Sequence, residues 1–136
     1  MAWVVDTCLL LDIGFDDPHF AVKSEQLLDS KSSDGLVICP VTYVELAPAF
    51  GGQTKPLEDF LLNLGIDYRG DWTWADTREA NGMWAAHVRR RRARKAMKRP
   101  VADVLIAAFA SRFEGLLTRN SSDFASLLPR NKVVEP

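Results

Sequence analysis

VVDTCLLLD, residues 4–12, is the stretch that decides the fold. The apolar run at residues 3–5 predicts a short buried strand that stops at Asp6, and residues 7–11 predict a short helix directly after it. A strand that passes at once into a helix is the repeating unit of α/β proteins. The sequence therefore predicts an α/β fold from its first residues onward.

The rest of the chain repeats this alternation of short apolar runs and helical patterns. Four more strands are expected, at residues 36–39, 66–68, 116–118 and 133–134. Helices are expected between them, at residues 18–30, 40–50, 55–64, 73–92, 101–113 and 121–128. Pro48 should end or kink the second of these helices. Short apolar strands separated by helices imply a parallel sheet covered on both faces, which is a three-layer α/β/α sandwich.

The bulk composition fits one domain spanning residues 1–136. Hydrophobic residues make up 47% of the chain and charged residues 26%, an ordinary globular balance. No apolar run approaches the roughly 20 residues that span a bilayer, and the N-terminus does not resemble a signal peptide. Two cysteines, Cys8 and Cys39, are too few for a disulfide framework, so we expect buried thiols and a cytoplasmic protein without a membrane contact.

Acidic residues follow several of the expected strands. Asp6 follows the first strand, Glu45 lies one turn into the helix after the second, and Asp123 follows the fourth. Asp103 lies in the first turn of the expected helix at residues 101–113. Sites in parallel sheets lie at the carboxyl ends of strands, and Mg²⁺ prefers oxygen ligands. A divalent ion would also hold together carboxylates that repel one another.

Each of these acids also has a purely structural interpretation. Asp6 could cap the helix that follows it, and TYVE at residues 42–45 matches a capping box. Asp103 could complement a helix dipole, and Asp123 could cap the last short helix. Composition alone does not decide between these interpretations and a metal site.

Four motifs, in order along the chain, resemble those of PIN-domain ribonucleases. VVDTCLLLD resembles the opening motif, a strand ending in Asp followed by Thr or Ser, and PVTYVELA resembles the second, which supplies a Glu. RPVADVLIAAFA resembles the third, an Asp before an apolar helix, and LLTRNSSDFASL resembles the fourth, with Thr, a polar gap and Asp-Phe. The resemblance covers nearly the whole chain. It best fits the VapC-like group, the ribonuclease toxins of bacterial and archaeal toxin–antitoxin pairs.

The resemblance implies a metal-dependent endoribonuclease. Asp6 and Asp103 would bind Mg²⁺, or Mn²⁺ in its place, and Glu45 would be the third acid. Such an ion activates water for attack on a phosphodiester and neutralises charge on the phosphate. A fourth catalytic acid is expected at Asp123, in the Asp-Phe position.

The sequence does not decide which residue completes this site or how many metal ions it holds. Some relatives carry an acid where this chain has Asn120, so either Asn120 or Asp123 completes the site, and one or two ions are compatible with it. Thr7 and Thr118 would orient water or ligands. Cys8 stands where relatives often have Ser or an apolar residue, and we expect it to pack and not to act as a nucleophile.

The segment RRRRARKAMKR, residues 89–99, contrasts with the acidic remainder of the chain. It holds eight basic residues and no acid, so a net charge of −1 leaves −9 for all other residues. Such a run favours contact with a polyanion, although a solvated helix end is the alternative. Because the run leads straight to Asp103, we expect Arg91, Arg92, Arg94 and Lys95 to guide RNA phosphates toward the acids.

The resemblance also implies partners: an RNA substrate, a cognate antitoxin and a second copy in a homodimer. Trp72, Trp74 and Trp84 could stack on bases, but helix packing or a dimer contact is the favoured interpretation. One alternative is a PIN-like RNA-processing or RNA-binding protein without an antitoxin. A phospho-acceptor receiver domain is disfavoured, because the third strand leads to Arg69-Gly70 and not to the Asp that such domains need.

Overall fold

The protein is described by a computed structural model that covers residues 1–93 and 100–136. Within these residues the sheet has five parallel strands in the order β3-β2-β1-β4-β5. The strands are β1 Trp3–Val5, β2 Leu36–Val37, β3 Ile66–Asp67, β4 Gly115–Leu117 and β5 Val133–Val134. The first strand is central and fully buried, as its apolar sequence predicts.

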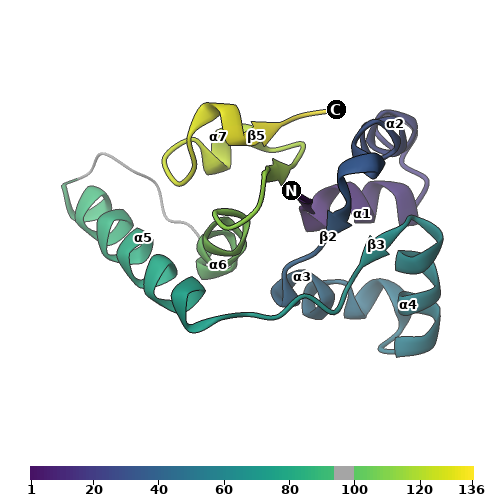
Figure 1. Ribbon diagram of the computed structural model, residues 1–136, viewed down its shortest axis with the longest axis horizontal. Helices are drawn as coiled ribbons and strands as arrows, with labels where there is room; N and C mark the ends of the chain where they lie inside the picture. Colours follow the sequence, from purple (N-terminus) through teal and green to yellow (C-terminus); the bar gives the residue numbers. More distant parts are fainter. Residues whose placement is uncertain (94–99) are drawn as a thin grey trace.

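Helices alternate with the strands along the chain. The α-helices are α1 Thr7–Gly14, α2 Ala21–Lys31, α3 Pro40–Glu45, α4 Thr54–Asn63, α5 Trp74–Arg92, α6 Val101–Ala110 and α7 Ser121–Phe124. The 3-10 helices are η1 Ser32–Asp34, η2 Ala47–Phe50 and η3 Arg130–Lys132. Figure 1 shows α1, α2 and α4 on the right of the sheet and α5, α6 and α7 on the left. None of the helices in the described ranges is long and apolar enough to cross a membrane.

Two apolar cores lie on opposite faces of the sheet, and β1 contributes to both. Val4 packs in the core formed mainly with α6, whereas Val5 packs in the core formed with α1, α2 and α4. Successive side chains of a strand point to opposite faces, so this division follows from the strand itself. The three-layer α/β/α sandwich and the parallel sheet are therefore confirmed.

Several element boundaries differ from the sequence-based expectation. The helix expected at residues 101–113 ends at Ala110, and the one expected at residues 121–128 ends at Phe124. The first ends early because the chain turns back to place Glu114 N–H on the carbonyl of Ala2, 2.9 Å away, which starts β4 one residue early. As expected, the helix after β2 is interrupted near Pro48, where η2 replaces it.

Candidate functional site

Asp6 and Thr118 are neighbours because β1 and β4 are paired in parallel. Val5 lies opposite Leu117, so the residues that follow the two strands emerge side by side. The Asp6 N–H donates to the Leu117 carbonyl at 2.9 Å, and the Thr118 hydroxyl donates to Asp6 Oδ2 at 2.7 Å. The Thr7 N–H donates to Asp6 Oδ1 at 2.8 Å. Asp6 is thus the N-cap of α1, and both of its oxygens have a fixed direction.

Glu45, at the end of α3, lies close to Asp6 through a shared neighbour. The Thr7 hydroxyl donates to Glu45 Oε1 at 2.7 Å and lies 3.0 Å from Thr42 Oγ1. The capping-box interpretation of residues 42–45 is wrong, because α3 begins at Pro40 and its N-cap is Cys39. Glu45 is therefore held by α1 across the carboxyl edge of the sheet and not by its own helix.

The electrostatic setting of Asp6 opposes its negative charge. Burial raises the pKa of Asp6 and outweighs the hydrogen bonds from Thr118, Cys8 and Thr7, and the nearby charge of Glu45 raises the pKa further. In the described part of the chain, no arginine, lysine or histidine forms an ion pair with Asp6. A buried carboxylate in this position favours a bound cation.

The Cys8 thiol also contacts this carboxylate. It donates to Asp6 Oδ2 at 3.4 Å and lies 3.5 Å from Thr118 Oγ1. Burial and the Asp6 charge raise the pKa of Cys8 to about 11, so the thiol stays protonated at neutral pH. This supports the prediction that Cys8 is not a nucleophile, although it is half-buried and only Cys39 is fully buried.

The other predicted site residues lie on other elements. Asp103 is half-buried in the first turn of α6, and Asp123 is exposed in α7. The Asn120 N–H donates to Thr118 Oγ1 at 3.0 Å, which ties this loop to the site. Across residues 1–93 and 100–136, no three His, Cys, Asp or Glu side chains form a group that could hold a metal ion as they stand. The structure thus relates Asp6 and Glu45 to each other, but it does not present the four acids as a ready-made cluster.

One ion pair beside the site has no counterpart in the sequence-based predictions. Arg119, the residue after Thr118, forms two hydrogen bonds to Asp12 of α1. The partners are 107 residues apart, so no local pattern could pair them. Their only signal was that both lie inside the motifs that resemble PIN domains, at the end of the first and within the fourth.

The basic residues at the end of α5 are only partly described. Arg91 and Arg92 are exposed in the last turn of α5, whereas Arg94 and Lys95 lie outside the described residues. An exposed arginine pair is available to phosphate, but it is equally compatible with a solvated helix end. Guidance of RNA by this run therefore stays a prediction.

The tryptophans divide into packing and surface residues. Trp72 stacks on Phe109 with ring centroids 6.3 Å apart and an angle of 8° between the planes, and its indole N–H donates to Thr77 at 2.8 Å. Packing is thus the correct interpretation for Trp72, whereas Trp74 and Trp84 are exposed.

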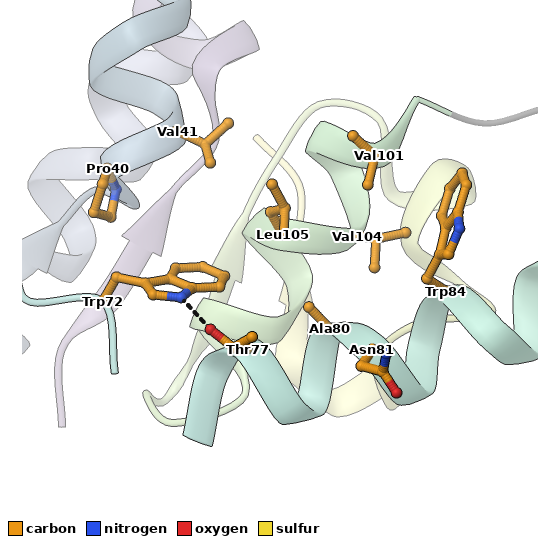
Figure 2. A pocket seen from close by; sticks show the side chains of 10 residues that line it. All are labelled: Pro40, Val41, Trp72, Thr77, Ala80, Asn81, Trp84, Val101, Val104 and Leu105. Atoms are coloured by element: carbon orange, nitrogen blue, oxygen red, sulfur yellow. Dashed lines mark hydrogen bonds between the residues drawn. The ribbon is translucent and has the colours of Figure 1, made fainter. Parts of the chain in front are cut away.

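Figure 2 shows Trp72 and Trp84 lining an apolar groove between α5 and α6 that reaches the start of α3. The groove has a volume of about 540 Å³. Its lining comprises Pro40, Val41, Trp72, Thr77, Ala80, Asn81, Trp84, Val101, Val104 and Leu105. An open apolar surface of this kind is typical of an interaction site.

Comparison with known proteins identifies the fold. No protein-family model and no curated protein matches the sequence. A solved structure described as "Crystal structure of VapBC2 from Rickettsia felis bound to a DNA fragment from their promoter" matches with a TM-score of 0.73 and 16% identity, over 99% of this chain and 98% of that one. The fold is PIN-like. At this level of identity the likeness concerns the fold, and it extends over nearly the whole chain, as the four sequence motifs do.

Proposed function

We propose that this chain is a metal-dependent endoribonuclease of the VapC-like group, the toxin of a toxin–antitoxin pair. The observation that carries the proposal is Asp6: a buried carboxylate at the carboxyl edge of a parallel sheet, beside Glu45, with no ion-pair partner in the described residues. This is the position at which the first motif of PIN domains supplies an acid. The PIN-like fold supports the proposal at the level of architecture.

The residues present fit magnesium by the chemistry of their donors. Asp6 and Glu45 offer carboxylate oxygens, and Asp103 at the start of α6 would be the third ligand, with Asn120 or Asp123 completing the set. When bound, Mg²⁺ or Mn²⁺ would supply Lewis-acid activation of water and neutralise charge on the scissile phosphate.

The threonines would keep the acids in place for this ion. The Thr118 hydroxyl fixes Asp6 Oδ2, and the Thr7 hydroxyl fixes Glu45 Oε1. Hydrogen bonds of this kind orient metal ligands, and their loss weakens metal binding without removing a ligand. The protein thus contributes orientation and burial.

RNA is the substrate we propose. Arg91 and Arg92 project from the last turn of α5 and could neutralise phosphates, together with Arg94 and Lys95 in the sequence that follows. Unpaired RNA is favoured over a duplex, because the deep major groove of an A-form helix is closed to side chains. A toxin with this activity would act on RNA in the cytoplasm of its own cell.

An antitoxin is the protein partner that follows from the same proposal. The matching structure is described as VapBC2 bound to a DNA fragment from their promoter. The four sequence motifs of this chain resemble the VapC-like group, whose members are the toxins of toxin–antitoxin pairs. We propose that this chain likewise pairs with a cognate antitoxin. Co-purification with the product of a neighbouring small gene tests this proposal, whereas a non-toxic protein without a partner would favour an RNA-processing role.

A homodimer is the assembly we propose for the apolar groove of Figure 2. Val101 and Trp84 expose 51% and 37% of their surface there, and a second copy would cover both. Val101→Glu should shift the protein from dimer to monomer in sedimentation. Val22→Glu, at an exposed valine of α2, is the control and should leave the dimer intact.

The decisive experiment for the function compares purified protein on RNA and DNA strands of the same sequence, with Mg²⁺ and with a chelator. We expect cleavage of RNA only, and only with the metal. Cleavage that persists with the chelator would contradict the metal, and RNA binding without cleavage would favour the alternative of an RNA-binding module.

A further inference from the structure

An arginine fork lies directly beside the proposed metal site. Arg119 follows Thr118, and Asp12 lies in the last turn of α1, the helix that Asp6 caps. Arg119 Nε donates to Asp12 Oδ2 at 2.8 Å, and a second guanidinium nitrogen donates to Oδ1 at 3.0 Å. A two-point contact of this kind fixes the direction of the arginine as well as its distance.

The fork is partly buried and has a second contact. The Asp12 side chain is 5% exposed and the Arg119 side chain 33%, so most of the contact is shielded from water. The guanidinium also lies 4.6 Å from the ring centroid of Phe20, in cation–π contact. Arg119 is thus held from two sides, and the loop after β4 is fastened to α1.

The fastened loop reaches Asp6 through a chain of hydrogen bonds. The Asn120 N–H donates to Thr118 Oγ1 at 3.0 Å, and the Thr118 hydroxyl donates to Asp6 Oδ2 at 2.7 Å. Arg119 is the residue between these two partners. Because Arg119 is covalently bonded to both Thr118 and Asn120, a displacement of Arg119 would shift both residues, and with them the hydroxyl that donates to Asp6.

We infer that Asp12 and Arg119 form a positioning pair for the proposed active site, holding Thr118 so that its hydroxyl aims the Asp6 carboxylate. The inference rests on the proposed function, because it assigns these residues a role in that same site. Neither residue is assigned a contact with substrate or metal.

The chain offers a matched control for this inference. Asp76 and Arg112 form a similar ion pair at 2.6 Å, with side-chain exposures of 1% and 35%. Arg112 also lies over aromatic rings, 5.1 Å from the centroid of Phe109 and 5.0 Å from that of Phe113. Within the described residues, no hydrogen bond links this second pair to Asp6 or its partners.

The first test compares Arg119→Gln with Arg112→Gln in Mn²⁺ affinity and RNA cleavage. Loss of the positioning pair should raise the Kd for Mn²⁺ by about tenfold or more, as for other groups that orient metal ligands. It should lower kcat with little change in KM, since RNA contacts are untouched. Arg112→Gln should change the melting temperature but not the Kd for Mn²⁺, kcat or KM. Equal changes in both variants would overturn the inference.

A second variant tests whether the effect passes through Thr118. In a Thr118→Val background the hydroxyl is absent, so Arg119→Gln should cause little further rise in the Kd for Mn²⁺. Two fully additive effects would show that Arg119 acts by another route. Arg119→Lys keeps the charge without the fork and should give an intermediate Kd, which keeps the test decisive if Arg119→Gln does not fold.

A third measurement separates this inference from the proposed function. Hydrogen exchange of the Asn120 amide reports on the loop directly and requires neither metal nor activity. We expect exchange about tenfold faster in Arg119→Gln than in Arg112→Gln. If wild type neither binds metal nor cuts RNA, the proposed function fails, and this exchange rate still decides the role of the pair. Unchanged protection of Asn120 would refute it.

Discussion

Asp6 and Asp76 are two buried aspartates at the starts of helices, and their pKa values are shifted in opposite directions. Asp76, in the first turn of α5, completes a capping box with Thr73 and pairs with Arg112. Burial alone would raise the pKa of Asp76, but the hydrogen bonds and charge of Arg112 and the bonds from Thr73 lower it overall. Asp6 also caps a helix, yet burial dominates and its pKa is raised.

The difference shows how a structural acid is told apart from a candidate functional one. A carboxylate paired with an arginine adds to the free energy of unfolding at neutral pH. A buried carboxylate without a cation has an unfavourable negative charge, which a bound cation would stabilise. Helix capping is common to both and does not distinguish them. The comparison thus assigns Asp76 to stability and Asp6 to the proposed metal site.

Loss of the Asp6 charge should have the largest effect on activity and should not destabilise the metal-free protein. Asp6→Asn, like Asp103→Asn, should reduce RNA cleavage by at least about a thousandfold, or about 4 kcal/mol of transition-state stabilisation. The fold should persist, because an amide relieves repulsion with Glu45. Cleavage rates and circular dichroism measure both effects, with Asp34→Asn in η1 as an exposed control. Full activity in either variant would contradict the proposal that the replaced aspartate binds the metal.

Loss of the Asp76 charge should act on stability instead. Removing one partner of a fully buried ion pair costs about 3–5 kcal/mol, but Arg112 keeps about a third of its side chain in water. We therefore expect Asp76→Asn to lower the free energy of unfolding by about 2 kcal/mol. Urea unfolding measures this, and Asp6→Asn should show no loss. The assignment is wrong if Asp6→Asn is the more destabilised of the two.

The pH dependence of stability should carry the signature of Asp76. Its pKa in the folded state is lowered from an unfolded value of about 3.9, so its stabilisation is complete above that value and is lost as the pH falls through the folded pKa. The difference in unfolding free energy between wild type and Asp76→Asn should be constant near neutrality and shrink below about pH 4. A difference that grows on acidification would contradict the sign of the shift.

The smallest expected effect concerns the arginines at the end of α5. Replacing Arg91 and Arg92 by Gln keeps long side chains and helix propensity. If each contacts one phosphate of single-stranded RNA, the slope of log affinity against log salt should become shallower by about 1.4 in total, or about 0.7 for each. Binding at several salt concentrations and a melting curve test this. An unchanged slope would leave these arginines as a solvated helix end.

The positions of the strands and the edge of the site could be predicted from the sequence. The apolar runs at β1 and β4 are short and unambiguous, and parallel pairing forces the residues after them, Asp6 and Thr118, to the same edge. The pairing explains why the Thr118 hydroxyl reaches Asp6, whereas the orienting role of Thr118 was implied by the family resemblance and stays a prediction. Boundaries were less predictable, since α7 stops at Phe124 although the apolar pattern continues to Leu128.

Contacts between distant segments could not be predicted from local pattern. Residues 42–45 match a capping box, yet Glu45 accepts a hydrogen bond from Thr7, 38 residues away in the chain. The Asp12–Arg119 pair depends in the same way on where α1 lies relative to β4. Only the folded arrangement decides which of several chemically reasonable partners each side chain meets.

The claim that Asp6 binds a divalent cation is tested most directly by thermal unfolding at increasing Mg²⁺ concentrations. A ligand at 100 times its Kd stabilises the folded state by about 2.7 kcal/mol, so the melting temperature of wild type should rise with the metal concentration. Asp76→Asn should start lower and gain the same stabilisation, because its change lies at the other aspartate. Asp6→Asn should gain none over the same range. An equal rise in Asp6→Asn and wild type would contradict the account.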